Sequence, residues 1–97
     1  MAVRYRREYD LIIGEMVDAL KHLEGYFEFL GLGSKEWDAL GVEIQDECLK
    51  TMSHDIIYGL GTEPVIYVGR GSIKYEPDLA QIRIFDGDRA VYVVRLN

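Results

Sequence analysis

The sequence has few of the features that would cross-link a chain, anchor it in a membrane or divide it into parts. Its single cysteine, Cys48, has no partner among the 97 residues, so no disulfide can form within the chain. The longest apolar run, residues 90–94, is far shorter than the roughly 20 residues that a membrane-spanning helix needs. Only two prolines occur, and no low-complexity stretch separates the two halves. We therefore predict one cytoplasmic domain over residues 1–97 that contacts no membrane.

Charge is unevenly distributed along the chain, which has a formal net charge of −6. Residues 1–7 contain three arginines, residues 8–61 contain twelve acidic and three basic side chains, and residues 62–97 contain five of each. Because an acidic surface repels phosphate groups, nucleic acid is not expected as a partner of residues 8–61. The start interleaves Arg4, Arg6 and Arg7 with Tyr5, as nucleic-acid-binding arms do. We interpret this short segment as a flexible tail.

The first half predicts two helices. From Ile13 to Leu30, apolar residues recur at alternating spacings of three and four, which predicts a helix over about 6–30. Glycines at 31 and 33 end it, and Ser34 is the expected N-cap of a second helix over about 35–58. The short linker implies an antiparallel helical hairpin over about 6–58. The second helix has an unusually broad apolar arc, so we expect contacts on two of its sides.

The second half has the alternating pattern of strands and predicts a β-meander over about 64–96. Its clearest feature is the hairpin around Asp86-Gly87-Asp88. A two-residue turn there places Ile82, Ile84, Val91 and Val93 on one face and Phe85, Tyr92 and Val94 on the other. Helices segregated from an antiparallel sheet define an α+β fold, with three to four strands after the helical hairpin.

Residues with the chemistry of catalysis or metal binding are not arranged as a site in the sequence. None of the paired glycines opens a helix in a nucleotide-binding pattern. Cys48 lies on the apolar arc of the second helix, where a thiol is inert. Asp18 and His22 lie at the level of Glu43 and Glu47 in a hairpin, but their helical phase points them to solvent. We therefore expect no catalytic residue, metal site or cofactor, and a protein that is not an enzyme.

The surfaces favour a small acidic protein-interaction module, of a regulatory or adaptor kind. Glu36, Glu43 and Glu47 form the polar strip of the second helix, and they are the expected contacts for a basic protein partner. A second apolar surface, formed by Phe85, Tyr92 and Val94, exceeds what a core of this size needs and predicts a homodimer. An alternative is a small-ligand binder, with an apolar cleft between the second helix and the sheet of the dimer.

Another alternative comes from the order of the elements. A helical hairpin followed by antiparallel strands that close with the hairpin of residues 82–96 is similar to the RelE/ParE toxin superfamily. The resemblance implies a nuclease or a nucleic-acid-binding protein, and the candidate face is then formed by Arg70, Arg83, Arg95 and Tyr92. Arg83 and Tyr92 are expected to be cross-strand neighbours. The chain departs from those toxins in its acidic helical half, because they are usually basic and begin with a strand.

Overall fold

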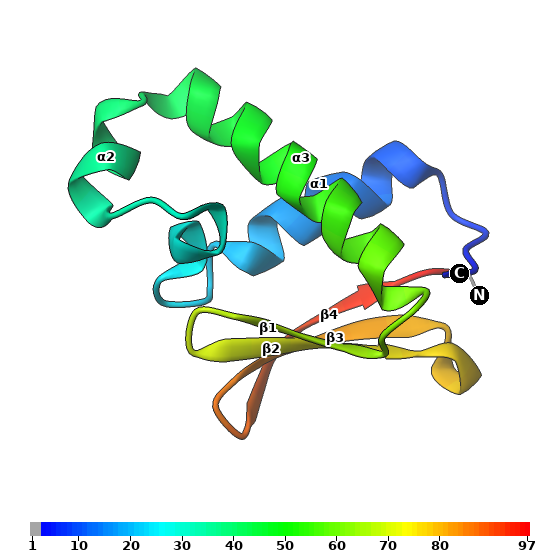
Figure 1. Cartoon of the computed structure of the whole chain (residues 1–97). Coiled ribbons are helices and arrows are strands. Elements are labelled where there is room, and N and C mark those ends of the chain that lie inside the picture. Colours follow the sequence, from blue (N-terminus) through cyan, green and yellow to red (C-terminus); the bar gives the residue numbers. More distant parts are fainter. Residues whose placement is uncertain (1–2) are drawn as a thin grey trace.

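The computed structural model describes residues 3–97 as helices followed by a sheet (Figure 1). The helical half contains α1 (Tyr9–Leu20), the short 3-10 helix η1 (Tyr26–Leu30), α2 (Ser34–Ala39) and α3 (Val42–Leu60). The second half contains β1 (Val65–Val68), β2 (Gly71–Glu76), the 3-10 turn η2 (Pro77–Leu79), β3 (Gln81–Asp86) and β4 (Arg89–Arg95). The α+β prediction is confirmed.

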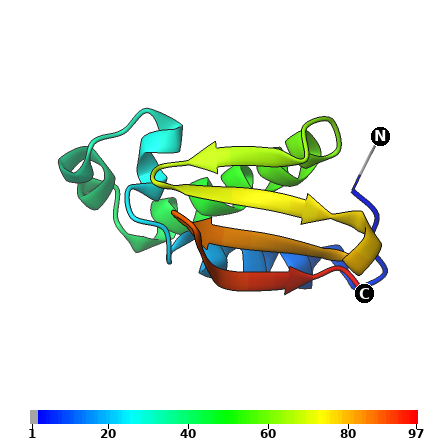
Figure 2. The ribbon, with the colours of Figure 1, turned by 90° about the horizontal axis from the view of Figure 1, so that it is seen from below.

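The molecule has two layers. The four strands are antiparallel and lie in the order β1-β2-β3-β4, which is the meander predicted from the sequence. The helices α1, η1 and α3 pack on one face of this sheet, and no part of residues 3–97 covers the opposite face (Figures 1 and 2). We call these the inner and the outer face of the sheet. The outer face is therefore exposed to solvent and accessible to a binding partner.

One hydrophobic core joins the two layers. It receives buried side chains from α1, α3 and the inner face of the sheet, each at most 1 % exposed: Ile12, Met16, Leu20, Leu49, Met52, Ile56, Ile73, Ile82 and Ile84. Burying one such side chain contributes about 1.5–3 kcal/mol. The core thus depends on both halves of the chain, and neither half can bury its apolar face without the other.

The first predicted helix is wrong in its length. It ends at Leu20, ten residues before the predicted end. Two backbone hydrogen bonds that span three residues each close the last turn: the N–H of His22 donates to the carbonyl of Ala19, and the N–H of Leu23 donates to the carbonyl of Leu20. The side chain of Leu23 is buried in the core and packs on the backbone of Gly71. A Cβ added to Gly71 would lie only 2.5 Å from the Cδ2 of Leu23. Gly25 then takes a left-handed conformation (φ 75°), which ends the helical path. Packing against the sheet overrides the heptad pattern here.

The second predicted helix is in fact two. Gly41 adopts φ 81° and separates α2 from α3. The predicted cap is also wrong, because α2 begins at Ser34 itself, and Glu36 Oε1 instead accepts a hydrogen bond from the Gly33 N–H at 3.3 Å. The two helices of the predicted helical hairpin are α1 and α3, which cross each other in Figure 1 and are joined by residues 21–41.

An aromatic cluster fixes this connection to the fold. Trp37 of α2 is 3 % exposed, stacks on Phe27 with ring centroids 6.1 Å apart, and donates its Nε1–H to the hydroxyl of Tyr26 at 3.0 Å. Gln45 of α3 donates from its Nε2 to the carbonyl of Trp37 at 2.8 Å. Residues of η1, α2 and α3 therefore hold one another through a single tryptophan.

The predicted facing of β4 is wrong. Its hairpin begins as expected, with Asp86 opposite Arg89 and Phe85 opposite Ala90, but a β-bulge then leaves Val91 without a partner. Beyond it Ile84 faces Tyr92 and Ile82 faces Val94, so the register is displaced by one residue. A displacement of one residue moves every later side chain to the opposite face. Val94 therefore lies in the core, and Val93 lies on the outer face.

Candidate functional sites

The first candidate site is a hollow beside the first half of α3. Its volume is about 460 Å³, and we call it the acidic groove; it is lined by Leu30, Glu43, Ile44, Glu47, Cys48 and Thr51. Because side chains four apart share a helix face, Glu43 and Glu47 form one edge of the groove. Ile44 is 53 % exposed, and the neighbouring Val42 is 72 % exposed. The groove therefore combines an apolar floor that faces solvent with two carboxylates.

The three glutamates predicted to bind a partner are not all brought together. Glu43 and Glu47 both line the acidic groove, and only Glu47 has an ion-pair contact among residues 3–97, with Lys50 at 3.8 Å. Glu36 belongs to α2, where its carboxylate accepts the hydrogen bond from the Gly33 N–H. It serves the start of α2 and is not a lining residue of the groove. Cys48 is half-buried in the groove wall.

The outer sheet face is the second candidate site, and only part of the predicted set lies there. Phe85 is on this face, half-buried, with the guanidinium of Arg83 5.1 Å from its ring centre. Val94 is fully buried in the core. Tyr92 also points inward, where its ring lies 5.5 Å from that of His22. Their places on the outer face are taken by Tyr67, which is 77 % exposed, and by Val93, which was predicted on the core face and is 42 % exposed.

The residues of the predicted nucleic-acid face are dispersed by the same register. Arg70 lies in the β1–β2 turn and pairs with Glu24 at 3.7 Å, whereas Arg95 lies opposite Gln81, at the other end of the sheet. Arg83 faces Val93 across the strands, not Tyr92, and its guanidinium is 3.4 Å from Glu76. The pKa of the Glu76 carboxyl is lowered, first by a hydrogen bond from Gln81 and then by the charge of Arg83. Of the four predicted residues, Arg83 and Arg95 thus share the outer face, whereas Tyr92 points inward and Arg70 lies in a turn.

The N-terminal arm is fixed to the fold, so its interpretation as a flexible tail is wrong. Val3 is 8 % exposed, and the backbone N–H groups of Arg6 and Arg7 donate to the carbonyl of Leu96. Arg7 pairs with Glu15 of α1 and also donates to the carbonyl of Arg95 at 3.0 Å. The hydrogen bonds from Arg7 hold the pKa of the Glu15 carboxyl below its usual range. The signal in the sequence was Val3, an apolar residue directly before the basic segment of residues 4–7.

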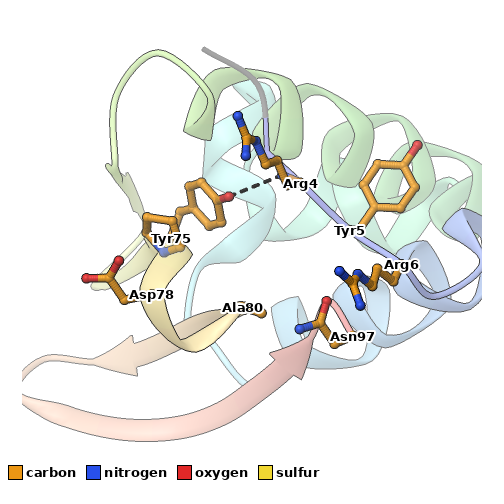
Figure 3. Close-up of a pocket in the computed structure, with 8 residues that line it drawn as sticks. Arg4, Tyr5, Arg6, Tyr75, Asp78, Ala80 and Asn97 are labelled. Carbon is orange, nitrogen blue, oxygen red and sulfur yellow. Dashed lines mark hydrogen bonds between the residues drawn. The ribbon is translucent and has the colours of Figure 1, made fainter.

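A third candidate site lies between this arm and the turn after β2, at the end of the fold where residues 3–6 lie beside Leu96 and Asn97 (Figure 3). It is an open pocket of about 790 Å³, which we call the arm pocket; it is lined by Arg4, Tyr5, Arg6, Tyr75, Pro77, Asp78, Ala80 and Asn97. The backbone N–H of Arg4 donates to the hydroxyl of Tyr75 at 3.1 Å, which ties the arm to β2 across the pocket. Sequence reasoning missed this site because its walls are 70 residues apart along the chain.

Two further kinds of feature are absent from residues 3–97, a metal-ligand cluster and a membrane-spanning helix. Among residues 3–97, no group of three or more histidine, cysteine, aspartate or glutamate side chains is close enough to hold a metal ion. None of the helices in this part of the chain is long and apolar enough to span a membrane. Comparison with protein-family models, curated proteins and solved structures found no significant match.

Proposed function

We propose that the protein is an acidic protein-interaction module whose acidic groove binds a basic amphipathic helix of a partner protein. The observation that carries this proposal is the exposed apolar floor of the groove, with Ile44 more than half exposed beside the carboxylates of Glu43 and Glu47. Burial of apolar surface contributes a favourable free energy of about 25 cal/mol per Å². Covering the side chains of Ile44 and Val42 with a partner therefore favours formation of the complex.

The chemistry of the groove favours a helix that carries both leucine-like and lysine-like side chains. Leu30 of η1 and Ile44 of α3 both contribute apolar surface to the groove, as a helix lying in a groove requires. Glu43 and Glu47 lie at the edge, where positive side chains of the partner can reach them without full loss of water. Such rim charges accelerate association and weaken with salt, while the apolar contacts determine how long the complex lasts.

A synthetic lysine–leucine amphipathic helix is the direct probe of this proposal. We expect it to bind the wild-type protein in calorimetric titration, and we expect the Glu43→Lys/Glu47→Lys variant to bind at least about tenfold more weakly. The matched control is Asp10→Lys/Asp18→Lys, which makes the same change in net charge on exposed positions of α1. Ile44→Ser removes the apolar contact and keeps both carboxylates, and it is also expected to weaken binding.

Three outcomes would contradict the proposal. The first is no binding of the peptide at millimolar concentration. The second is an equal loss of affinity in the two charge-reversal variants, which would show an effect of net charge alone. The third is an Ile44→Ser protein that binds as well as wild type, in which case the apolar floor has no part in recognition.

We propose in addition that a second copy of the chain binds the outer sheet face. Tyr67 and Val93 expose apolar surface there, and Phe85 lies beside them. The face carries both signs of charge, with Lys74 and Arg83 alongside Glu76, so it can meet a copy of itself with opposite charges in contact. An isologous dimer needs this kind of self-complementary patch.

Light scattering after size-exclusion chromatography tests the dimer. Wild type is expected to elute as a dimer at micromolar concentration, and Val93→Glu is expected to elute as a monomer. The control Leu79→Glu places the same charge on an apolar side chain that is 63 % exposed in the η2 turn, away from the strands, and it is expected to stay dimeric. A monomeric wild type, or dissociation by both substitutions alike, would refute this part of the proposal.

A further inference from the structure

The arm pocket contains two arginines, Arg4 and Arg6, on a backbone segment that is anchored to the fold on both sides. Val3 anchors the arm before Arg4, and the hydrogen bonds of Arg6 and Arg7 to Leu96 anchor it after Tyr5. Arg4 and Arg6 both line the pocket, and within residues 3–97 neither guanidinium has an ion-pair partner. Figure 3 shows the Arg4 side chain beside Tyr75 and the Arg6 side chain beside Asn97; both are exposed and can turn toward an anion between them. Guanidinium groups bind phosphate through two parallel hydrogen bonds, so the pair is suited to an oxyanion.

The opposite wall has different chemistry. Figure 3 shows Tyr75 and Asp78 across the pocket from Arg6 and Asn97, with Ala80 near its base. Tyr75 and Pro77 give this side flat, apolar surface, while the Asp78 carboxylate accepts hydrogen bonds and repels an anion. A ligand that satisfies both walls must carry negative charge at one end and a flat body with N–H donors at the other.

The backbone at the base of the pocket is strained. Ala80 has φ 48° and ψ 53°, and it is the only non-glycine residue with a positive φ in the described part of the chain. A left-handed conformation is unfavourable for a residue with a Cβ, and such residues concentrate where a binding surface must hold a particular shape. The left-handed conformation of Ala80 turns the chain from η2 into β3. This turn positions Pro77 and Asp78 in the pocket wall.

We propose that the arm pocket binds a nucleoside monophosphate, with the phosphate on Arg4 and Arg6 and the base against Tyr75 and Pro77. Asp78 accepts a hydrogen bond from an amino group of the base, which distinguishes this ligand from a simple anion. The pocket volume lies within the range of about 300–1,000 Å³ typical of small-molecule sites. The pocket is separate from the acidic groove, which lies toward η1 and the start of α3, so this inference stands independently of the proposed function.

Titration of the full chain with adenosine 5′-monophosphate, adenosine and inorganic phosphate tests the inference. The monophosphate is expected to bind at least about tenfold more tightly than either of the other two, because only it contacts both walls. Arg4→Ala/Arg6→Ala is expected to lower that affinity at least about tenfold. The control Arg70→Ala/Arg89→Ala removes the same charge from exposed arginines outside the pocket and is expected to leave affinity unchanged.

Asp78 provides a test whose two effects have opposite signs. Asp78→Ala is expected to strengthen the binding of inorganic phosphate, because a repelling charge is lost, and to weaken the binding of adenosine 5′-monophosphate relative to it. Unchanged melting temperatures show that the variants are folded. The inference is overturned if the monophosphate does not saturate the protein at millimolar concentration, if phosphate alone binds as tightly, or if both arginine pairs give equal losses.

Discussion

Gly69 and Glu24 are 45 residues apart in sequence, yet a Cβ on Gly69 would lie 2.5 Å from the carbonyl oxygen of Glu24. Gly69 is in the β1–β2 turn, where its φ is 57°, and Glu24 is in the turn after α1. The helical layer and the sheet therefore approach each other backbone to backbone at this point. The nearby pairs Arg70–Glu24 and Leu23–Gly71 strengthen the same contact.

The first prediction concerns this close approach. Gly69→Ala is expected to lower the free energy of unfolding by about 1 kcal/mol for the positive φ, and by about 1–3 kcal/mol more because the Glu24 backbone must shift. Gly87→Ala is the matched control, since Gly87 has nearly the same φ of 61° with no atom near the added Cβ. Urea unfolding of both variants measures the difference. Equal losses would mean that the turn relaxes without moving Glu24.

The second prediction tests the bulge in the β3–β4 hairpin. Val94→Asp places a charge in the core at a fully buried position and is expected to unfold the protein, because a buried unpaired carboxylate costs several kcal/mol. Val93→Asp, at the adjacent position on the outer face, is expected to leave it folded. Circular dichroism with thermal melting distinguishes the two. A hairpin without the bulge would place Val93 in the core and Val94 on the outer face, and would therefore predict that Val93→Asp unfolds the protein. A folded Val94→Asp protein would support that facing and contradict the bulge.

The third prediction concerns acid. Because Arg7 lowers the pKa of Glu15 in the folded state, the folded chain binds fewer protons than the unfolded chain near the ordinary glutamate pKa. The stabilisation is complete above about pH 4.3 and is lost as the pH falls through the lower folded value. Glu15→Gln is expected to be less stable at pH 7 and to lose less stability below pH ~4.3. Denaturation midpoints across pH 3–7 that fall in parallel for both proteins would contradict this.

The fourth prediction separates the two sides of α3. Met52→Ala is expected to lower the free energy of unfolding by about 2–5 kcal/mol, because Met52 is fully buried and its loss leaves a cavity. Val42→Ala is expected to change it by less than about 0.5 kcal/mol, because Val42 is 72 % exposed and alanine favours helix. Chemical denaturation measures both. A large loss for Val42→Ala would place Val42 in the fold and would remove it from the proposed binding surface.

The α+β class and the order of the elements were predictable because they depend on local pattern. Spacing of apolar residues predicted two main helical regions, and alternation predicted the strands of the meander, with the turn at Gly87. Glu43 and Glu47 could be placed on one strip because the helical period of 3.6 residues is insensitive to where α3 begins. These features need no knowledge of what packs against them.

Several errors share one origin. The end of α1 at Leu20 follows from Leu23 packing on Gly71, and the inward position of Tyr92 and Val94 follows from a bulge at Val91. Neither can be read from neighbours in sequence, since each depends on a partner brought close by folding. The break at Gly41 is different, because glycine occurs within many helices and only its φ shows that this one ends α2.

Composition and periodicity alone established the fold class, the acidic character of the helical half and the exclusion of a disulfide within residues 1–97. Which side chains share a surface follows only from the packing of the folded chain. The arm pocket joins Arg4 and Arg6 to Tyr75 and Asp78, and the acidic groove joins Leu30 to Ile44, across long separations in the chain. Such sites exist only when the two layers pack, because the free energy that places their walls comes from the core between those layers.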